Sequence, residues 1–216
     1  MLALNLPHNG SAPLKVLCLG SHSDDIEIGC GGTILRLLST NHNLEVVWVV
    51  FSSGKERLRE AHNSAEMFLE QARQKEIVVN AFRDGFFPFE GARIKDFFEG
   101  LKSVSPDLIF THSRNDAHQD HRLIADLTWN TFRNHLILEY EIPKFDGDLG
   151  QPNFFVPLKQ EIYQNKIRYI MDAFETQRTK RWFERETFLA LMRLRGMECV
   201  APSGYAEAFY CRKLVF

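Results

Sequence analysis

The chain has 216 residues, of which 44% are apolar and 25% charged, and its formal net charge is −2. Such a composition is ordinary for a globular protein, and it provides no basic face of the kind that nucleic acids or anionic membranes attract. The length suits one domain, residues 1–216, in which residues 1–12 are expected to be a flexible or loosely packed N-terminal segment.

The cysteines indicate a reducing environment. There are four, with no CxxC pair among them: Cys18, Cys30, Cys199 and Cys211. Cys18 lies in an apolar run, where a small buried thiol is the usual interpretation. No charged segment followed by an apolar run opens the sequence, and no apolar run approaches the length of a membrane span. We therefore expect a cytoplasmic protein with neither a membrane nor a nucleic-acid partner.

Apolar runs predict four strands in the first half of the chain, at residues 14–20, 44–52, 76–82 and 106–112. Helical patterns lie between them, at residues 32–39, about 55–74 and 94–104, and the segment DAHQDHRLIADLTWNTF leads into a further helix. Because the strands are continuous apolar runs that alternate with helices, the predicted fold class is α/β. We expect a Rossmann-like single domain with a mainly parallel sheet flanked by helices.

The second half of the chain is less regular. Residues 138–158 are rich in Pro, Gly and Asp, and they predict a strand and a loop that could line a site. Residues 159–195 predict two helices that are broken near Thr176, and the closing segment YAEAFYCRKLVF predicts a last strand. The aromatic residues of this half could support self-association, so a homo-oligomer is one expectation.

Polar groups follow all four strands of the first half. His22 follows the first strand, residues 52–54 the second, Asp84 the third and residues 112–121 the fourth. In open parallel sheets, ligands bind outside the carboxyl ends of the strands. One shared site at this edge of the sheet is therefore favoured over four unrelated surface features.

Two of these groups combine imidazoles and carboxylates: His22-Ser-Asp24-Asp25 and His118-Gln-Asp120-His121. A catalytic zinc typically takes three protein ligands of these kinds and leaves a fourth position for water. Each cluster by itself also fits a surface turn or a helix cap. Because buried or half-buried charges need a partner, the presence of both clusters at strand ends of one domain favours a shared metal site.

Neighbouring residues within each cluster suit different tasks. Adjacent side chains in a turn point in different directions, so one of Asp24 and Asp25 can bind a metal while the other acts as general base. His118 and His121 are three residues apart and would project from one face of a helix start. One of them can be a ligand, and the other an acid or an electrostatic stabiliser.

These residues resemble the motifs of a known family. HSDDIEIGCGGTI, which starts at His22, is similar to the HPDDxExGCGGT motif of the PIG-L/LmbE-like deacetylases, and DAHQDHR is similar to their DxHPDHR motif. Four shorter matches occur in the family order: RLREA at 57–61, RDG at 83–85, PNFFV at 152–156 and AEAF at 206–209. The resemblance covers nearly the whole chain.

The resemblance implies a zinc-dependent hydrolase that removes an acyl group, usually acetyl, from the nitrogen of an amino sugar. The implied metal ligands are His22, Asp25 and His121, and Asp24 would be the general base that deprotonates the bound water. One Zn²⁺ per chain is implied, although other divalent metals accept the same ligand types. Amide hydrolysis at neutral pH needs such an activated water, because bulk water is a weak nucleophile.

The remaining implied roles concern the substrate. His118, aided by Asp120 or Asp116, would stabilise the tetrahedral intermediate or help to protonate the leaving amine. Arg57 and Asp84 match positions that contact sugar hydroxyls, to which they can donate and accept hydrogen bonds. The expected partner is therefore a small amino-sugar derivative.

The chain departs from the family pattern at three positions. Ser23 and Gln119 replace the prolines of HPDD and HPDH, and Ile26 stands where an acidic residue is frequent. Neither Ser23 nor Gln119 supplies a ligand, so the chemistry is expected to survive, although both loops lose the stiffness that proline gives.

Other interpretations use the same residues. A metal-dependent hydratase of an unsaturated carboxylic acid would need a positively lined pocket, and a non-catalytic carbohydrate-binding relative would not need Asp24. Residues 29–32 lack the GxGxxG spacing of a dinucleotide loop, and the nearby aspartates would repel a pyrophosphate. These glycines are instead expected to let the backbone turn into the first helix and pack on the sheet. The role of His112, at the end of the fourth strand, stays open.

Overall fold

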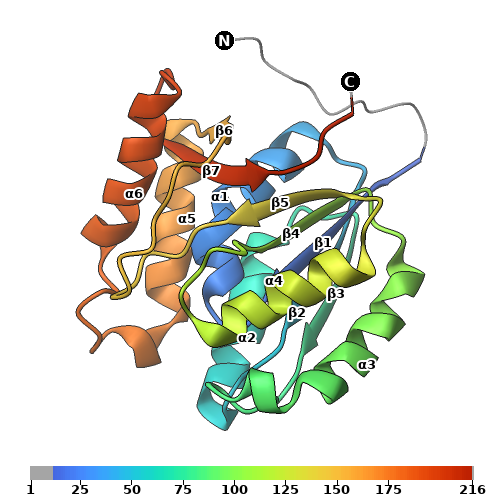
Figure 1. The fold of residues 1–216 in the computed structure, drawn as a ribbon. Helices are drawn as coiled ribbons and strands as arrows, with labels where there is room; N and C mark the ends of the chain where they lie inside the picture. Colours follow the sequence, from blue (N-terminus) through green and yellow to red (C-terminus); the bar gives the residue numbers. More distant parts are fainter. Residues whose placement is uncertain (1–11, 216) are drawn as a thin grey trace.

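Strands and helices alternate through the first half of the chain, as the hydrophobic pattern predicts (Figure 1). A computed structural model of the protein describes residues 12–215. The expected flexible segment, residues 1–12, lies outside the described residues except for its last residue. Within residues 12–215, a seven-stranded sheet and six α-helices confirm the α/β class.

The strands form one sheet in the order β3-β2-β1-β4-β5-β7-β6. Their bounds are Leu14–Gly20 (β1), Leu44–Val50 (β2), Gln74–Val79 (β3), Leu108–His112 (β4), Leu136–Tyr140 (β5), Phe154–Pro157 (β6) and Ala206–Cys211 (β7). Neighbours among β1 to β5 pair in parallel, whereas β7 is antiparallel to both β5 and β6. The prediction of a mainly parallel sheet is therefore confirmed.

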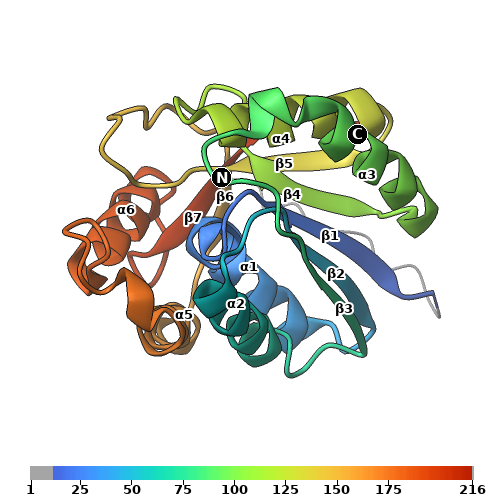
Figure 2. The ribbon, with the colours of Figure 1, turned by 90° about the horizontal axis from the view of Figure 1, so that it is seen from below.

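Helices cover both faces of the sheet. Their bounds are Asp25–Thr40 (α1), Lys55–Phe68 (α2), Gly91–Leu101 (α3), Gln119–Thr131 (α4), Gln160–Ala173 (α5) and Arg185–Glu198 (α6). Figure 2 shows α3 and α4 on one face and α1, α2 and α5 on the other. Successive side chains of β1 point to opposite faces, so Val16 and Cys18 join the core beneath α1 and α2, while Leu17 and Leu19 join the core beneath α3 and α4.

The first helix begins earlier than the sequence predicted. α1 starts at Asp25 rather than at residue 32, so the glycines of GCGG lie inside the helix and do not form a turn before it. Close packing explains them: a Cβ on Gly29 would lie 2.2 Å from the ring of Tyr140, and one on Gly31 would lie 2.5 Å from the ring of Phe68. Glycine lowers helical propensity, which is why the local pattern placed the start too late.

Other boundaries shift less. α2 ends at Phe68 and not at residue 74, where β3 already begins. The break near Thr176 is confirmed, because α5 ends at Ala173 and α6 begins at Arg185. Residues 138–158 hold the end of β5, a loop at residues 141–153 and the whole of β6, so the expected strand and loop are present together with part of a second strand.

The strand order reverses between β1 and β4. β2 pairs with one edge of β1 and β4 with the other edge. In open α/β sheets, the crevice at such a point, outside the carboxyl ends of the strands, is the usual ligand site. His22 follows β1 and His112 ends β4, so the two predicted clusters leave the sheet at this place.

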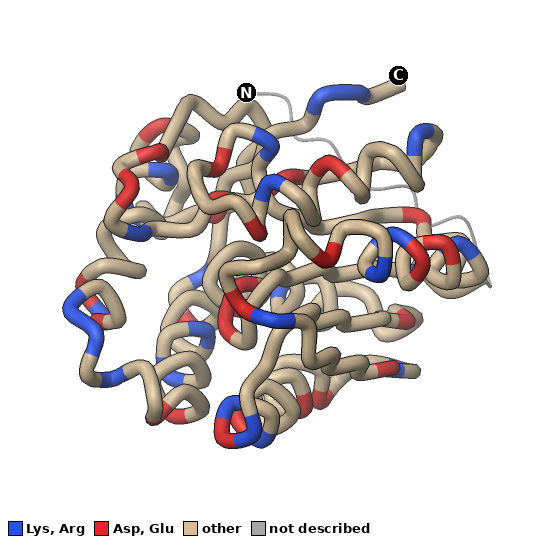
Figure 3. The backbone as a smooth tube through the Cα atoms, turned by 60° about the horizontal axis from the view of Figure 1, so that its bottom comes forward, with Lys and Arg blue, Asp and Glu red and all other residues tan. Residues whose placement is uncertain are grey.

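Charged residues of both signs are interspersed around the described part of the chain (Figure 3). This distribution agrees with the small net charge of −2. None of the helices within residues 12–215 combines the length and the apolar character that spanning a membrane requires.

Candidate metal centre

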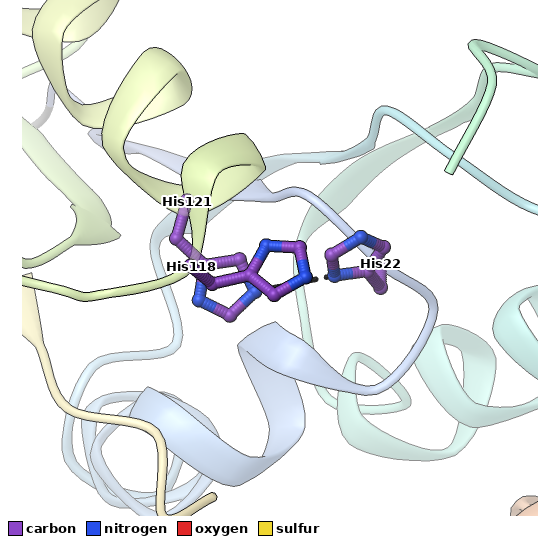
Figure 4. A group of neighbouring side chains, drawn as sticks. All are labelled: His22, His118 and His121. Carbon is purple, nitrogen blue, oxygen red and sulfur yellow. Dashed lines mark hydrogen bonds between the residues drawn. The ribbon is translucent and has the colours of Figure 1, made fainter. Parts of the chain in front are cut away.

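Three side-chain atoms from the two clusters converge where the strand order reverses. His22 lies on the loop after β1, Asp25 begins α1 and His121 lies in the first turn of α4, and all three are buried. Figure 4 shows the rings of His22, His118 and His121 gathered together. His22 Nδ1 lies 3.2 Å from His121 Nε2 and 3.4 Å from Asp25 Oδ2, and the last two atoms are 3.6 Å apart. Ligands of a tetrahedral zinc are about 3.3 Å apart when each bond is about 2.0 Å, so a metal ion fits this group.

Each histidine of this group directs its other ring nitrogen to a carboxylate. His121 Nδ1 lies 2.9 Å from Asp116 Oδ2. His22 Nε2 lies 3.3 Å from Asp120 Oδ2 and 3.1 Å from Asp84 Oδ1. Metal-binding histidines are commonly held in this way, because the carboxylate keeps the proton on the outer nitrogen and leaves the lone pair of the inner nitrogen free.

The charges act differently on the three residues. Burial would lower the pKa of His22, but the Asp25 charge and the hydrogen bonds with Asp120 and Asp84 outweigh it and raise the pKa well above its ordinary value, so a metal ion would have to displace a proton from this ring. Burial, and after it the neighbouring His112, lowers the pKa of His121 to about 4, so this imidazole is neutral near pH 7. Burial would raise the pKa of Asp25, but the charges of the surrounding histidines outweigh it and lower the pKa well below its usual range. Asp25 therefore keeps the negative charge that a metal ligand needs.

Asp24 lies next to Asp25 but has different partners. Its Oδ1 accepts a hydrogen bond of 2.8 Å from Arg57 Nη2, whereas its Oδ2 is buried without a partner in the protein. Burial raises the pKa of Asp24, and the Arg57 guanidinium opposes the rise. The two adjacent carboxylates thus occupy opposite electrostatic environments.

His118 is the N-cap residue of α4. Its Nδ1 accepts the Asp120 N–H at 3.3 Å. Its ring centroid lies 4.6 Å from that of His121 and 5.0 Å from that of His22. Besides His22, Asp25 and His121, the described residues offer other groups of ligand atoms within 4.8 Å of one another: His22 with His118 and His121, Asp25 with His112 and His121, and His22 with Asp84 and Asp120. The place is therefore rich in alternative metal ligands.

The structure gives His112, whose role the sequence left open, a place beneath the group. Its ring stacks on that of His121, with centroids 3.9 Å apart and an angle of 17°. Its Nε2 lies 3.2 Å from Asp25 Oδ2 and 3.0 Å from the Ser21 nitrogen. His112 is fully buried and supports both Asp25 and His121 from the side of the sheet.

The two residues expected to contact a sugar lie on the outer side of the group. Asp84 has a side chain that is 64% exposed, and its contact with His22 lowers the pKa of its carboxyl. It thus presents an ionised acceptor to solvent. Arg57, on α2, contacts Asp24 and is 21% exposed.

The carboxylates expected to aid His118 contact other groups. Asp120 accepts the N–H of Gly85 at 2.7 Å and that of Phe87 at 3.1 Å, in addition to its contact with His22. Asp116 contacts the ring of His121, and its Oδ1 accepts the backbone N–H of His118 at 2.8 Å. The contacts of these two carboxylates are thus with His22, His121 and backbone N–H groups, and their aid to His118 stays a prediction.

The two positions that lack the family prolines form side-chain contacts with neighbouring loops. Ser23 is buried, and its hydroxyl lies 3.3 Å from that of Ser53. The Gln119 amide donates to the carbonyl of Gly85. Hydrogen bonds thus take over part of the stiffening that proline would give.

Sequence reasoning missed Lys144, which lies in the loop after β5. Its Nζ is 3.1 Å from Asp116 Oδ2, the atom that also contacts His121. No motif marks this lysine, and the only signal was that residues 138–158 could line a site.

A family model matches the part of the chain that carries these clusters. The sequence model of the family described as PIG-L, GlcNAc-PI de-N-acetylase, matches residues 17–132, which is more than half of the chain and includes both clusters. The chain belongs to the PIG-L family. The resemblance seen in the motifs is confirmed.

Three individual proteins that the chain resembles are each less than 25% identical to it. The chain is 24% identical to the uncharacterized deacetylase YaiS of Escherichia coli K12 over 163 residues, 70% of this chain and 86% of YaiS. The N,N'-diacetylchitobiose deacetylase of Pyrococcus horikoshii is 22% identical with a TM-score of 0.67, over 90% of this chain and 82% of the other. GalB, the 4-carboxy-2-hydroxymuconate hydratase of Pseudomonas putida KT2440, is 15% identical with a TM-score of 0.74, over 94% and 98%. The two solved structures show that the PIG-L fold is shared.

Proposed function

We propose that this PIG-L family member is a zinc-dependent hydrolase that removes an N-acetyl group from a small amino-sugar derivative. The observation that carries the proposal is the convergence of His22 Nδ1, Asp25 Oδ2 and His121 Nε2 within 3.6 Å of one another. Two imidazoles and one carboxylate are a common ligand set of catalytic zinc. An N-acetylated amino sugar is also the substrate named for the Pyrococcus relative.

Asp24 would be the general base. When bound, zinc supplies a water whose pKa is about 7 instead of 15.7 and polarises the amide carbonyl. The Arg57 guanidinium holds Asp24 Oδ1, which leaves the buried Oδ2 free to take a proton. Because Asp24 directly precedes the ligand Asp25, the base and the metal group are fixed to the same helix start.

His118 would act on the other side of the scissile amide. Because its Nδ1 accepts the Asp120 N–H, the proton of the neutral ring lies on Nε2. That N–H can stabilise the negative charge that develops on the carbonyl oxygen. Its ring lies beside both metal-binding histidines, as this role requires. The proton that Asp24 would take from the attacking water is the one that would pass to the leaving amine.

The exposed charge at the site favours a hydroxyl-rich substrate. The Asp84 carboxylate faces solvent 3.1 Å from His22, where it can accept hydrogen bonds from sugar hydroxyls. Arg57 could donate to the same sugar from its exposed part.

All four cysteines are free thiols, which supports the cytoplasmic location that we propose.

The second candidate is a hydratase acting on an unsaturated carboxylic acid, since a hydratase shares the fold. A carboxylate substrate would approach the negative Asp84 carboxylate, whose side chain is 64% exposed beside His22. Like charges at short range repel, so this exposed charge favours the deacetylase.

Acetate release from a panel of N-acetylated sugars, together with metal analysis of the same sample, tests the proposal. We expect about one zinc per chain and metal-dependent release of acetate from at least one sugar. A metal-bound protein that hydrates unsaturated acids but releases no acetate would favour the hydratase. A protein that binds no divalent metal under non-chelating conditions would refute both functions.

A further inference from the structure

Lys144 contacts Asp116, which in turn contacts the candidate metal ligand His121. No motif assigns a role to this lysine. We propose that Lys144 is a positioning residue: through Asp116, it fixes the orientation and the tautomer of His121. This inference rests on the proposed function, in which His121 is a metal ligand.

A single carboxylate oxygen joins the two side chains. Asp116 Oδ2 lies 3.1 Å from Lys144 Nζ and 2.9 Å from His121 Nδ1. The side chains of Lys144 and Asp116 are only 12% and 3% exposed. Because water is largely excluded, this contact orders the carboxylate more strongly than a surface ion pair would.

The chemistry of the three groups determines where the protons lie. An ammonium has donors and no acceptor, so the oxygen that Lys144 contacts must be an acceptor. The same oxygen can then bind His121 only if the imidazole carries its proton on Nδ1. The lone pair of that ring is consequently on Nε2, the atom that faces His22 and Asp25.

Lys144 also contacts the turn that carries the second cluster. Its Nζ pairs with Asp148, whose Oδ2 accepts the N–H of Ala117 at 2.6 Å, and Asp116 Oδ1 accepts the N–H of His118. One ammonium thus bridges the loop after β5 and the start of α4.

The base of that loop is fixed independently. Arg195 Nε and Nη2 contact the Glu141 carboxylate at 2.9 and 2.8 Å, and Arg195 Nη2 also donates to the Gly150 carbonyl at 3.0 Å. Because Glu141 and Gly150 are both tied to α6, removal of the Lys144 amine should leave the path of the loop largely intact. The contact with Asp116 is what would be lost.

The alternative is that Lys144 only fastens the loop, and three variants separate these roles. Lys144→Met keeps the length of the side chain and removes its charge, whereas Lys144→Arg keeps a charged donor. Asp148→Asn removes the charge of the other partner of the same ammonium but leaves the Lys144–Asp116–His121 contacts. Thermal melting of each variant verifies that it is folded.

Two measurements report on the proposal. Nitrogen-15 NMR of the metal-free protein, with His121→Gln used to assign the signal, should show the Nδ1–H tautomer of His121 in the wild type, Lys144→Arg and Asp148→Asn, and its loss in Lys144→Met. With the N-acetyl substrate, kcat of Lys144→Met should fall about tenfold with little change in KM, in the range seen when outer partners of metal ligands are removed. The same substitution should have no further effect in an Asp116→Asn background.

The opposite results would overturn the proposal. An unchanged His121 tautomer in Lys144→Met, a raised KM with the same kcat, or equal losses in Lys144→Met and Asp148→Asn would make Lys144 a loop anchor only. The NMR result needs neither metal nor substrate. Failure of the Lys144 proposal is therefore distinguishable from failure of the proposed function, which would appear as a wild type without acetate release.

Discussion

Among the buried carboxyl groups along α1, Glu207 and Glu27 differ in whether they have hydrogen-bond partners. Glu207, on β7, accepts hydrogen bonds from the N–H groups of Gly32 and Thr33, from the Thr33 hydroxyl and from Lys166 Nζ, at 2.6 to 2.8 Å. Lys166 also donates to the Ile28 carbonyl at 2.6 Å. This pair therefore joins β7 and α5 to the middle of α1.

The start of the same helix is different. Glu27 is fully buried, and neither of its carboxyl oxygens has a partner in the protein, as is also true of Asp24 Oδ2. Native proteins leave few buried polar groups unpaired, and the exceptions are concentrated where a ligand binds or chemistry occurs. Hydrogen-bonded charges thus hold the middle of α1 in the fold, whereas its start, next to the candidate metal centre, keeps carboxyl oxygens without a partner in the protein.

The largest expected effect is at Asp24. Asp24→Asn removes the proposed base and should lower kcat about 10³-fold, the middle of the range for general bases, while the protein keeps its metal. His22→Ala should lose the metal itself. Turnover and metal content of both variants check this, with the exposed Asp146→Asn as control. Equal metal loss in the two variants would contradict the assigned roles.

The satisfied pair should matter for stability. Lys166→Met leaves the Glu207 charge buried without its cation, and it should lower the free energy of unfolding by about 3–5 kcal/mol. Denaturant titration measures the change. Lys159→Met, the same substitution at an exposed position before α5, should change it by less than about 0.5 kcal/mol. A small effect at Lys166 would show that this pair does not hold the helix.

Glu27 should give the stability a pH dependence. Burial raises the pKa of Glu27 to about 8 in the folded protein, above the ordinary value of 4.5. A raised pKa stabilises the fold below pH 4.5, and this contribution is lost as the pH rises toward 8. By pH 7 the loss is about 3 kcal/mol. Glu27→Gln should remove this slope, measured as unfolding free energy between pH 5 and 8, whereas Glu70→Gln on the surface should keep it. Parallel profiles for all three proteins would be incompatible with a buried, unpaired Glu27.

The smallest expected effect is at Gly32, where a side chain would crowd Leu158 and Glu207. A Cβ on Gly32 would lie 2.6 Å from Leu158 Cδ1 and 2.9 Å from Glu207 Oε1, so Gly32→Ala should lower the stability by about 1–2 kcal/mol. A Cβ on Gly100, in α3, would meet nothing within 4 Å. Gly100→Ala should therefore raise the stability by about 0.5–1 kcal/mol, as alanine does in a helix. Thermal or denaturant unfolding would show the two signs, and equal signs would contradict the crowding at Gly32.

Local sequence patterns were enough to predict the fold class and the chemical character of the site. Continuous apolar runs at residues 14–20 and 44–52 became parallel strands, because that pattern can be buried only between two layers of helices. The polar clusters that follow β1 and β4 had to meet at the same edge, because parallel strands point the same way. The motifs shared with the PIG-L family then identified the individual site residues, because the motifs occur along the chain in the family order.

Which side chains contact one another in the site depends on the tertiary structure. His22 and His121 are 99 residues apart, and which of their nitrogens face each other depends on how α1 and α4 sit on opposite faces of the sheet. The place of His112 under His121, the contacts of Asp120 with the loop at Gly85, and the reach of Lys144 to Asp116 are likewise long-range. Periodicity reports only on neighbours along one element, so it placed the start of α1 too late and gave Lys144 no role. Contacts between elements follow from strand order and side-chain packing, which no local pattern encodes.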